Sequence, residues 1–369
     1  RSHGKSLIHN AIETLTMCGR DVINYNIIPT PTAQFVVEKN NMAGGIVITA
    51  SHNPIEWNGL KFIDSDGCFL NNDKTQKLFD IADLNQIQNL SYGSIQSIEN
   101  GYFPHINHTK NLSINDTKSI EKRSFVVVVD AVNGAASSAL PAMMKALGCT
   151  VHTLYCKPDG KFPRGPEPIT KNLKHLQEAV ITYQADIGIA TDPDGDRLAV
   201  VDENGRSLNE EYTLIICADG FLNSTGSKKP LVTNLSSTLA LDKVAERYGC
   251  EVIRSAVGEI NVVNSMKNVG SCLGGEGNGG VILAESHYGR DSLVGAAMFL
   301  NRMAQDTQTV SEIFRSMPQY IMVKDKIALG SIDYQTAFEK IEAAYPDSYS
   351  VKTDGLKLCW ENSWVHIRN

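Results

Sequence analysis

The sequence predicts an α/β protein with three similar layered α/β domains around a cleft, followed by a partial fourth domain of the α+β type. Three observations lead to this prediction. A helical stretch that ends in glycine and is followed by a strand occurs three times along the chain. Short, largely apolar strands alternate with helical stretches, which is typical of layered α/β domains. The chain also has 369 residues, more than a single hydrophobic core usually holds.

The repeated units begin with helices that end at Gly19, Gly148 and Gly249. Glycine directly after a helix is typical of a left-handed C-terminal cap. Strand-forming residues follow these glycines, over 21–25, 150–154 and 251–254. The recurrence of this order predicts that the three units share one architecture.

Each unit then reaches a polar or glycine-rich loop. The loops, each with the apolar run before it, are 51–54 after 45–50, 191–197 after 185–190, and 274–280 after the shorter run 271–273. Ligands of layered α/β domains bind beside the carboxyl ends of strands. We therefore expect the three loops to converge on one cleft.

The domain boundaries are placed in polar stretches. The expected domains are 1–100, 101–223, 224–322 and a partial fourth domain over 323–369. The Asn- and Ser-rich stretch 85–122 is interpreted as a connection before a strand at 125–130. The fourth domain is expected to hold a helix over 334–344 and a strand around 357–360.

The sequence at both ends of the chain is typical of a domain that has been cut within a structural element. Arg1 already stands at a helix start signal, and the segment 364–369 reads as a strand without a partner. We therefore expect that both termini of the natural protein are missing, including the first strand of domain 1.

Composition limits the classes of partner. The net charge of −7, without a basic run, argues against nucleic acid or an anionic membrane surface as the main partner. A small phosphorylated ligand, which needs only a local positive pocket, remains compatible. No apolar run approaches the roughly 20 residues of a membrane span. Eight cysteines without a C-x-x-C pair are typical of reduced thiols in a cytoplasmic protein.

The loop 191–197 predicts a metal site. Asp192, Asp194 and Asp196 alternate with other residues, so the three carboxylates face one side of an extended segment. Like charges this close repel one another unless a cation lies among them. Carboxylate oxygens suit Mg²⁺ best, with Ca²⁺ or Mn²⁺ as alternatives. An EF-hand is disfavoured because its sixth position, which should be glycine, is Arg197, whereas a solvated acidic turn stays an alternative.

Ser51 is expected to follow a buried strand that holds its hydroxyl at a fixed place facing the cleft. A serine hydroxyl needs a base or a metal to act as a nucleophile. His52 is predicted to be a poor base for Ser51, because adjacent residues in an extended segment point to opposite sides. No G-x-S-x-G elbow surrounds Ser51. Taken alone, a Ser-His-Asn-Pro segment is more often a structural turn, since Asn and Pro favour turns.

The loop 274–280 has five glycines in seven residues, and such an open backbone lets a ligand approach closely. Glu276 and Asn278 offer an acceptor and an amide, which suit sugar hydroxyls. Flexible turns explain most lone glycine-rich loops. A cluster just beyond the next strand adds weight to a binding site; it holds His287, Arg290 and Asp291.

The three loops in this order resemble those of the α-D-phosphohexomutase family. The matching motifs are T-A-S-H-N-P with the following N-G-L-K-F (58–62), D-P-D-G-D-R, and G-E-G-N-G-G. The resemblance runs over essentially the whole chain, and it is closest to phosphoglucosamine and phosphomannose mutases. It implies an isomerase that interconverts hexose 6-phosphate and hexose 1-phosphate, a small-molecule substrate, with glucosamine phosphate as the first choice.

The resemblance also implies a role for each matched residue. Ser51 would carry the catalytic phosphoryl group. Asp192, Asp194 and Asp196 would bind Mg²⁺ together with an oxygen of that phosphoserine. Lys61 would be a general acid or base near Ser51. A hexose 1,6-bisphosphate would be both intermediate and activator.

Other matched residues would contact the phosphoryl groups or the sugar. Arg1 would match a catalytic arginine of the family's first domain, and Arg197 would contact the phosphoryl groups or the sugar. Glu276 and Asn278 would bind sugar hydroxyls, although many members carry serine in place of Asn278. Many members also carry a histidine directly after this loop; here His287 lies further on and is a candidate ligand contact.

Several alternatives stay open. The family's fourth domain carries a phosphate-clamping loop, and the chain ends where that loop should begin, so we expect the clamp to be absent. A phosphosugar phosphatase, in which water accepts the phosphoryl group, and a binding module without turnover are alternative functions. Phosphomannomutase and phosphoglucomutase are alternatives for the sugar, and the protein is expected to be a monomer or a homodimer.

Overall fold

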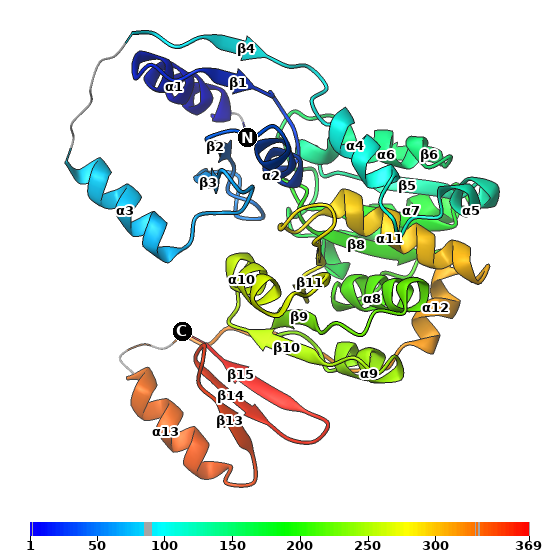
Figure 1. Ribbon diagram of the computed structural model, residues 1–369. Coiled ribbons are helices and arrows are strands. Elements are labelled where there is room, and N and C mark those ends of the chain that lie inside the picture. The colour runs from blue at the N-terminus through cyan, green and yellow to red at the C-terminus, as the bar shows by residue number, and fades with distance from the viewer. Residues whose placement is uncertain (2, 85–90, 329, 331–332, 369) are drawn as a thin grey trace.

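The computed structural model describes residues 1, 3–84, 91–328, 330 and 333–368. The chain forms four units that follow one another in an arc, with the first and the fourth unit at its two ends (Figure 1). The predicted fold class, with three α/β units and a fourth α+β unit, is confirmed.

The second unit is built on a four-stranded sheet. Its strands are β5 (Val126–Asp130), β6 (Thr150–Leu154), β7 (Ile187–Thr191) and β8 (Leu198–Asp202). They lie in the order β6-β5-β7-β8, where β5 pairs in parallel with β6 and β7, and β8 is antiparallel to β7. The central strands are almost fully buried, which their runs of Val, Ile and Ala allow.

The third unit repeats this sheet. Its strands are β9 (Leu231–Asn234), β10 (Val252–Ser255), β11 (Leu273–Glu276) and β12 (Gly280–Leu283). The order β10-β9-β11-β12, with only β12 antiparallel, matches the second unit strand for strand. The predicted repeat is therefore confirmed for these two units.

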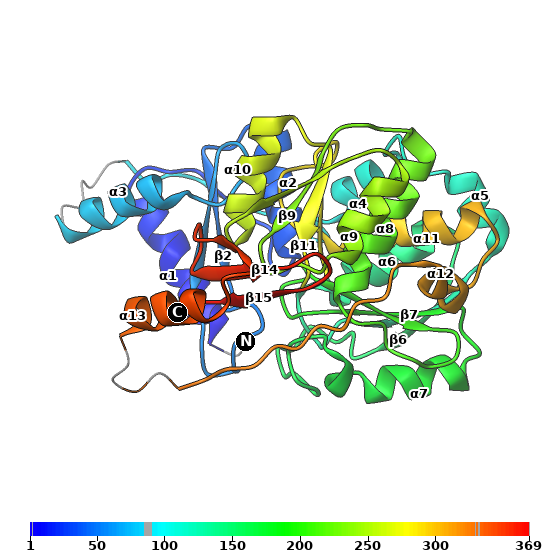
Figure 2. The same cartoon turned by 90° about the horizontal axis from the view of Figure 1, so that it is seen from below.

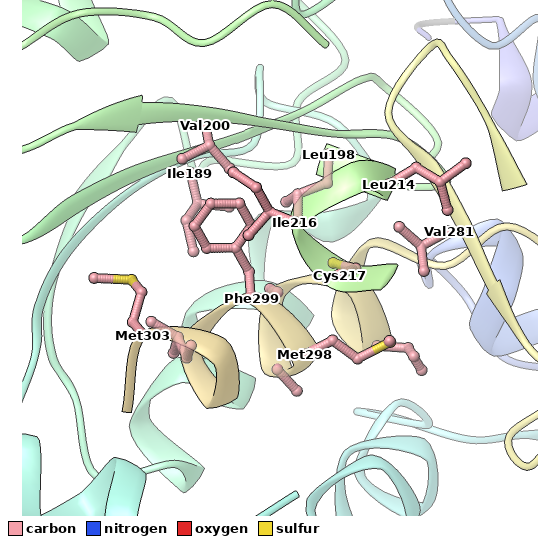
Figure 3. Packing of buried hydrophobic residues seen from close by; sticks show 14 of the residues in the cluster. Ile189, Leu198, Val200, Leu214, Ile216, Cys217, Val281, Met298, Phe299 and Met303 are labelled. Atoms are coloured by element: carbon pink, nitrogen blue, oxygen red, sulfur yellow. The ribbon is translucent and has the colours of Figure 1, made fainter. Parts of the chain in front are cut away.

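Helices cover the two sheets and join them. They are α4 (Phe103–Lys110), α5 (Thr117–Arg123), α6 (Ala139–Ala146), α7 (Lys174–Thr182), α8 (Glu211–Thr225), α9 (Ala240–Arg247), α10 (Glu259–Val269), α11 (Ser292–Gln305) and α12 (Val310–Ser316). One hydrophobic cluster spans both units, and Figure 3 shows Phe299 of α11 packed among Ile189, Val200 and Ile216. This shared core fixes the second and third units against each other.

The first unit has two small sheets. Its elements are α1 (Gly4–Met17), β1 (Val22–Asn24), α2 (Thr30–Lys39), β2 (Gly44–Ile48), β3 (Leu60–Asp64), α3 (Asn72–Asp83) and β4 (Ile95–Ser97). Strands β1 and β4 pair in parallel, and β2 and β3 form an antiparallel pair. Because β2 has only one neighbour, none of its residues is fully buried, and the prediction of a buried strand before Ser51 is wrong.

The fourth unit holds α13 (Tyr334–Ala344) and an antiparallel sheet of β13 (Tyr349–Val351), β14 (Leu356–Cys359) and β15 (Trp364–Ile367). The helix predicted over 334–344 is confirmed. The strand expected to lack a partner pairs with β14, so that prediction is wrong. In Figure 2 an extended segment runs from the end of α12 towards this unit. Lys357 Nζ donates to the carbonyl oxygen of Leu235 at 2.6 Å, which docks the fourth unit on the third.

The stretch 85–122 differs from the predicted connection. Residues 85–90 lie outside the described residues, and the remainder holds β4, α4 and α5. The predicted left-handed caps are confirmed, since φ is 72° at Gly19, 81° at Gly148 and 67° at Gly249. The boundaries expected at 100, 223 and 322 stay predictions. Among the described residues, no helix combines the length and the apolar character that crossing a bilayer requires.

Candidate active site

The three predicted loops occupy equivalent places in the first three units. Each connects a strand to its antiparallel neighbour, and the loops are 49–59 between β2 and β3, 192–197 between β7 and β8, and 277–279 between β11 and β12. Ser51 Oγ donates to Asp192 Oδ2 at 3.1 Å, which joins the first loop to the second. The chain therefore brings the predicted nucleophile to the predicted metal site.

Ser51 sits in a tight turn. Its φ of 46° is uncommon for a residue other than glycine, and its N–H donates to Thr49 Oγ1 at 2.9 Å. In this turn Ser51 Oγ lies 3.3 Å from His52 Nδ1, so the prediction that His52 points away from Ser51 is wrong. Burial, assisted by the charge of Arg197, lowers the pKa of His52 below its ordinary value. A neutral imidazole beside the hydroxyl can accept a proton.

Asp192, Asp194 and Asp196 are buried together at the end of β7, with carboxylate oxygens within 4.8 Å of one another. Gly195, at φ 73°, allows the loop to turn between them. Burial and repulsion from Asp196 and Asp194 raise the pKa of Asp192 well above its ordinary value. The Oδ1 atoms of Asp194 and Asp196 are buried and have no hydrogen-bond partner among the described residues. Orphaned carboxylate oxygens beside a third carboxylate fit a divalent cation such as Mg²⁺.

Lys61 reaches the aspartates from β3. Its Nζ lies 2.7 Å from Asp194 Oδ2 and 3.7 Å from Asp196 Oδ2. Burial would lower the pKa of Lys61, but the attraction of Asp194 and Asp196 outweighs it and raises the pKa above its ordinary value. The same ammonium group, against the effect of burial, holds the pKa of Asp194 well below its usual range. The ammonium group of Lys61 and the carboxylate of Asp194 therefore favour each other's charged form.

Arg1 and Arg197 hold backbone and carboxylate groups around the first two loops. Arg1 donates to the carbonyl oxygens of Ser51 at 2.7 Å and Asn53 at 3.0 Å, so it fixes the turn that carries the serine. Arg197 NH1 lies 3.0 Å from Glu167 Oε1, and the Arg197 N–H donates to Asp192 Oδ1. Arg197 is thus placed beside the metal loop, with one nitrogen already paired.

Glu276 lies at the end of β11 and is 3% exposed. Its Oε1 accepts from Asn234 Nδ2 at 2.7 Å and from the Gly258 N–H at 3.1 Å. Its Oε2 accepts from Arg290 NH1 at 2.7 Å and from Asn278 Nδ2 at 3.4 Å. Four donors already use the carboxylate, so a sugar hydroxyl can bind it only by replacing one of them. The Asn278 amide makes the longest of these contacts.

Arg290 is a site residue to which the sequence assigned no role. It is 8% exposed and contacts three carboxylates: Asp196, Glu259 and Glu276. Burial alone would lower the pKa of Arg290, but these carboxylates raise it well above its ordinary value. The only signal in the sequence is its place in the polar cluster after β12.

His287 is buried and paired with a carboxylate. It is 2% exposed, and its Nε2 lies 3.0 Å from Asp291 Oδ2. His105 Nε2 lies 2.9 Å from the same oxygen, and Thr32 Oγ1 is 3.0 Å from His105 Nδ1. This chain of contacts joins α2, α4 and the start of α11. A substrate could contact His287 only by replacing its pairing with Asp291, and the role of His287 as a substrate contact stays a prediction.

Comparison with known families gives an independent result. Three families described as Phosphoglucomutase/phosphomannomutase, alpha/beta/alpha domains I, II and III, match residues 1–88, 100–205 and 209–320. Their order along the chain is the order of the three α/β units.

Individual proteins agree with these matches. The Phosphoglucomutase/phosphomannomutase of Thermococcus kodakarensis is 35% identical over 373 residues, covering 100% of this chain and 81% of that protein. The Phosphoglucosamine/phosphogalactosamine mutase of Sulfurisphaera tokodaii is 29% identical, with 100% and 82% covered. In fold, the chain is similar to a phosphoglucomutase/phosphomannomutase family protein from Burkholderia thailandensis, with a TM-score of 0.82, 24% identity, and 97% and 78% covered. The chain therefore belongs to the α-D-phosphohexomutase family.

Proposed function

We propose that the protein is a phosphohexose mutase, which interconverts hexose 6-phosphate and hexose 1-phosphate through a phosphorylated Ser51. The observation that carries this proposal is the 3.1 Å contact between Ser51 Oγ and Asp192 Oδ2. It sets the only hydroxyl of the first loop's Ser-His-Asn-Pro segment against the carboxylates that fit a divalent cation. Phosphoryl transfer depends on positioning and charge neutralisation more than on covalent chemistry, and this arrangement supplies both.

The reaction consists of two phosphoryl transfers in opposite directions. In the first, a sugar hydroxyl oxygen forms a bond to phosphorus as the bond between phosphorus and Ser51 Oγ breaks, which gives a hexose 1,6-bisphosphate. The hydroxyl loses its proton and the Ser51 oxygen gains one. The bisphosphate then turns around and returns its other phosphoryl group to Ser51.

Lys61 and His52 are our candidates for the transfer of these protons. Lys61 is our candidate for the general acid or base, because its Nζ lies 2.7 Å from Asp194, within the aspartate cluster that Ser51 contacts. His52 Nδ1, 3.3 Å from Ser51 Oγ, can exchange the proton of the serine. Both groups lie in the first unit, His52 beside the Ser51 hydroxyl and Lys61 beside Asp194.

Asp192, Asp194 and Asp196 would hold Mg²⁺ together with an oxygen of the phosphorylated Ser51. When bound, the cation neutralises charge on the transferring phosphoryl group. Arg197 would add a second positive group beside the metal loop. Arg1 would act indirectly, because it donates to the backbone carbonyl oxygen of Ser51 at 2.7 Å and so fixes the turn that carries the serine.

Glucosamine phosphate is the proposed substrate, with mannose and glucose phosphates next, and a hexose 1,6-bisphosphate is the proposed activator. Glu276 and Asn278 would bind sugar hydroxyls by exchanging the 3.4 Å contact between them for contacts to the sugar. The Sulfurisphaera tokodaii relative, named for glucosamine and galactosamine phosphates, supports an amino sugar. We further propose a cytoplasmic monomer or homodimer without nucleic-acid or membrane partners.

The proposal is tested by intact mass and peptide mapping before and after incubation with glucose 1,6-bisphosphate and MgCl₂. We expect one phosphate on Ser51, and conversion of hexose 1-phosphate to hexose 6-phosphate that Ser51→Ala abolishes. Ser94→Ala is the matched control, because Ser94 also donates its hydroxyl to an aspartate of the first unit, Asp21, at 2.6 Å. Release of free phosphate without isomerisation would indicate a phosphatase instead.

A further inference from the structure

Arg290 contacts residues of two loops: the metal loop, residues 191–197, and the sugar loop, residues 274–280. Its NH2 lies 2.6 Å from Asp196 Oδ2, its NH1 lies 2.7 Å from Glu276 Oε2, and its Nε lies 2.9 Å from Glu259 Oε2. Each carboxylate therefore receives a different nitrogen of one rigid, planar group. Glu259 in turn accepts from Gln34 Nε2 of α2 at 3.2 Å, so the first unit is tied to the same point.

Because Gly280 has no side chain, the side chain of Arg290 can pass directly over it. A Cβ atom on Gly280 would lie 2.2 Å from Arg290 Cδ and 2.8 Å from Arg290 Cγ. The backbone of Gly280 is not in the left-handed region, so it does not need glycine for its conformation. The glycine is needed for the close passage of the arginine side chain across β12.

Lys61 and Arg290 each bind one carboxylate oxygen of an aspartate and leave the other oxygen, Oδ1, without a partner among the described residues. Lys61 binds Asp194 through Oδ2, and Arg290 binds Asp196 through Oδ2. The Oδ1 atoms of both aspartates stay buried and without a hydrogen-bond partner among the described residues. A group that holds one oxygen of a metal-binding carboxylate fixes the direction of the other oxygen.

We propose that Arg290 is a positioning residue that orients Asp196 for the divalent cation and Glu276 for the sugar with one guanidinium group. Its position makes the two binding events interdependent, because a change at either carboxylate alters the contacts available to the other. The part that concerns the sugar rests on the proposed mutase function. The part that concerns the cation does not.

The experiment compares four variants with the parent protein: Arg290→Met, Arg290→Lys, Gly280→Ala and Arg302→Met. Arg302 is a matched control because it is equally buried and pairs with two aspartates, Asp219 at 2.7 Å and Asp306 at 2.9 Å, away from the site. Circular dichroism identifies the temperature range in which each variant is folded. Mn²⁺ binding is then measured within that range by electron paramagnetic resonance, without any sugar.

Loss of the group that orients a ligand weakens metal affinity by about 10- to 100-fold. We expect this loss in Arg290→Met and in Gly280→Ala, which keeps the charge but displaces the side chain. Arg290→Lys should retain part of the affinity, since an ammonium group can reach one or two of the carboxylates. Arg302→Met should bind Mn²⁺ like the parent. If folded Arg290→Met binds Mn²⁺ as tightly as the parent or more tightly, Arg290 does not orient Asp196.

Steady-state kinetics at saturating Mg²⁺ test the sugar half. Arg290→Met should then show a raised KM for hexose phosphate, because Glu276 has lost a donor that fixes it, whereas Arg302→Met should keep the parent KM. An unchanged KM in Arg290→Met would overturn this half. A parent protein that binds Mn²⁺ but isomerises no hexose phosphate would contradict the mutase proposal and would leave the Mn²⁺ comparison valid.

Discussion

Replacing Asp194 by Asn separates metal binding from folding. The change keeps the size of the side chain and removes one negative charge from the buried triad. It also removes the charge opposite Lys61, whose Nζ lies 2.7 Å from Asp194 Oδ2. Thr30 Oγ1, which donates to Asp194 Oδ2 at 3.1 Å, can still donate to the amide oxygen of Asn.

The electrostatic terms of this substitution nearly cancel in the metal-free protein. At an effective dielectric constant of about 20, the attraction between charges 2.7 Å apart is about 6 kcal/mol. Repulsion from Asp192 and Asp196, whose oxygens lie within 4.8 Å, is about 3 to 4 kcal/mol for each charged neighbour on the same scale. The lost attraction and the relieved repulsion are thus similar, and we expect the unfolding free energy of Asp194→Asn to change by no more than about 2 kcal/mol.

Metal-dependent stabilisation supplies the assay. At a Mg²⁺ concentration of about 100 times its Kd, binding to the folded state adds about 2.7 kcal/mol to the unfolding free energy of the parent protein. Asp194→Asn should gain almost none of this and should lose mutase activity. Asp219→Asn is the control, because Asp219 is also buried and paired, at 2.7 Å, with Arg302, yet lies outside the site. The reasoning is refuted if Asp194→Asn keeps the Mg²⁺-dependent stabilisation, or if it fails to fold while Asp219→Asn folds.

Two further substitutions probe the fourth unit and the metal loop. Burial lowers the pKa of Lys357 from 10.5 to about 8, so the unfolded chain binds this proton more tightly than the folded chain. The unfolding free energy of the fourth unit should therefore rise between pH 8 and 10.5 and stay constant below pH 8. Urea titrations followed by tryptophan fluorescence should show this rise. The variant Lys357→Met should not show it. A Cβ atom on Gly134 would lie 2.4 Å from the carbonyl oxygen of Pro193 in the metal loop. Gly134→Ala should cost about 1 to 3 kcal/mol of stability and weaken Mg²⁺ binding, whereas Gly4→Ala, with no atom closer than 3.7 Å, should change neither, as isothermal calorimetry and melting curves can establish.

The parts of the fold that follow local rules could be predicted from the sequence. The glycine caps and the repeated strand-and-loop order are local patterns, and the metal loop carries its three carboxylates in one segment of six residues. The helices in 103–123 escaped prediction because their Asn, Ser and His residues have weak helix propensity. Asp116, which caps α5 by accepting from the Ser119 N–H, and Pro104 in the first turn of α4 were the available start signals.

The contacts within the site could not be predicted from local patterns, because they depend on how the chain folds. The turn at Ser51 has a positive φ that no motif encodes, and this turn brings His52 to the serine hydroxyl. Arg290 stands far from Asp196 along the chain, and its role exists only because the second and third units share one core. Spacing within a loop therefore identified the candidate metal ligands, whereas the cationic groups that contact them could be found only in the folded chain.

The charges of the site predict an order of cation binding and phosphorylation. Five carboxyl groups surround two cationic groups, and these residues are Asp192, Asp194, Asp196, Glu259, Glu276, Lys61 and Arg290. Burial and repulsion from Asp196 and Asp194 raise the pKa of Asp192 well above its ordinary value, so the metal-free site disfavours further negative charge. A phosphoryl group on Ser51 would add about −1.5 to −2 charges to an oxygen that lies 3.1 Å from Asp192 Oδ2. We therefore predict that a divalent cation binds before, or together with, phosphorylation of Ser51.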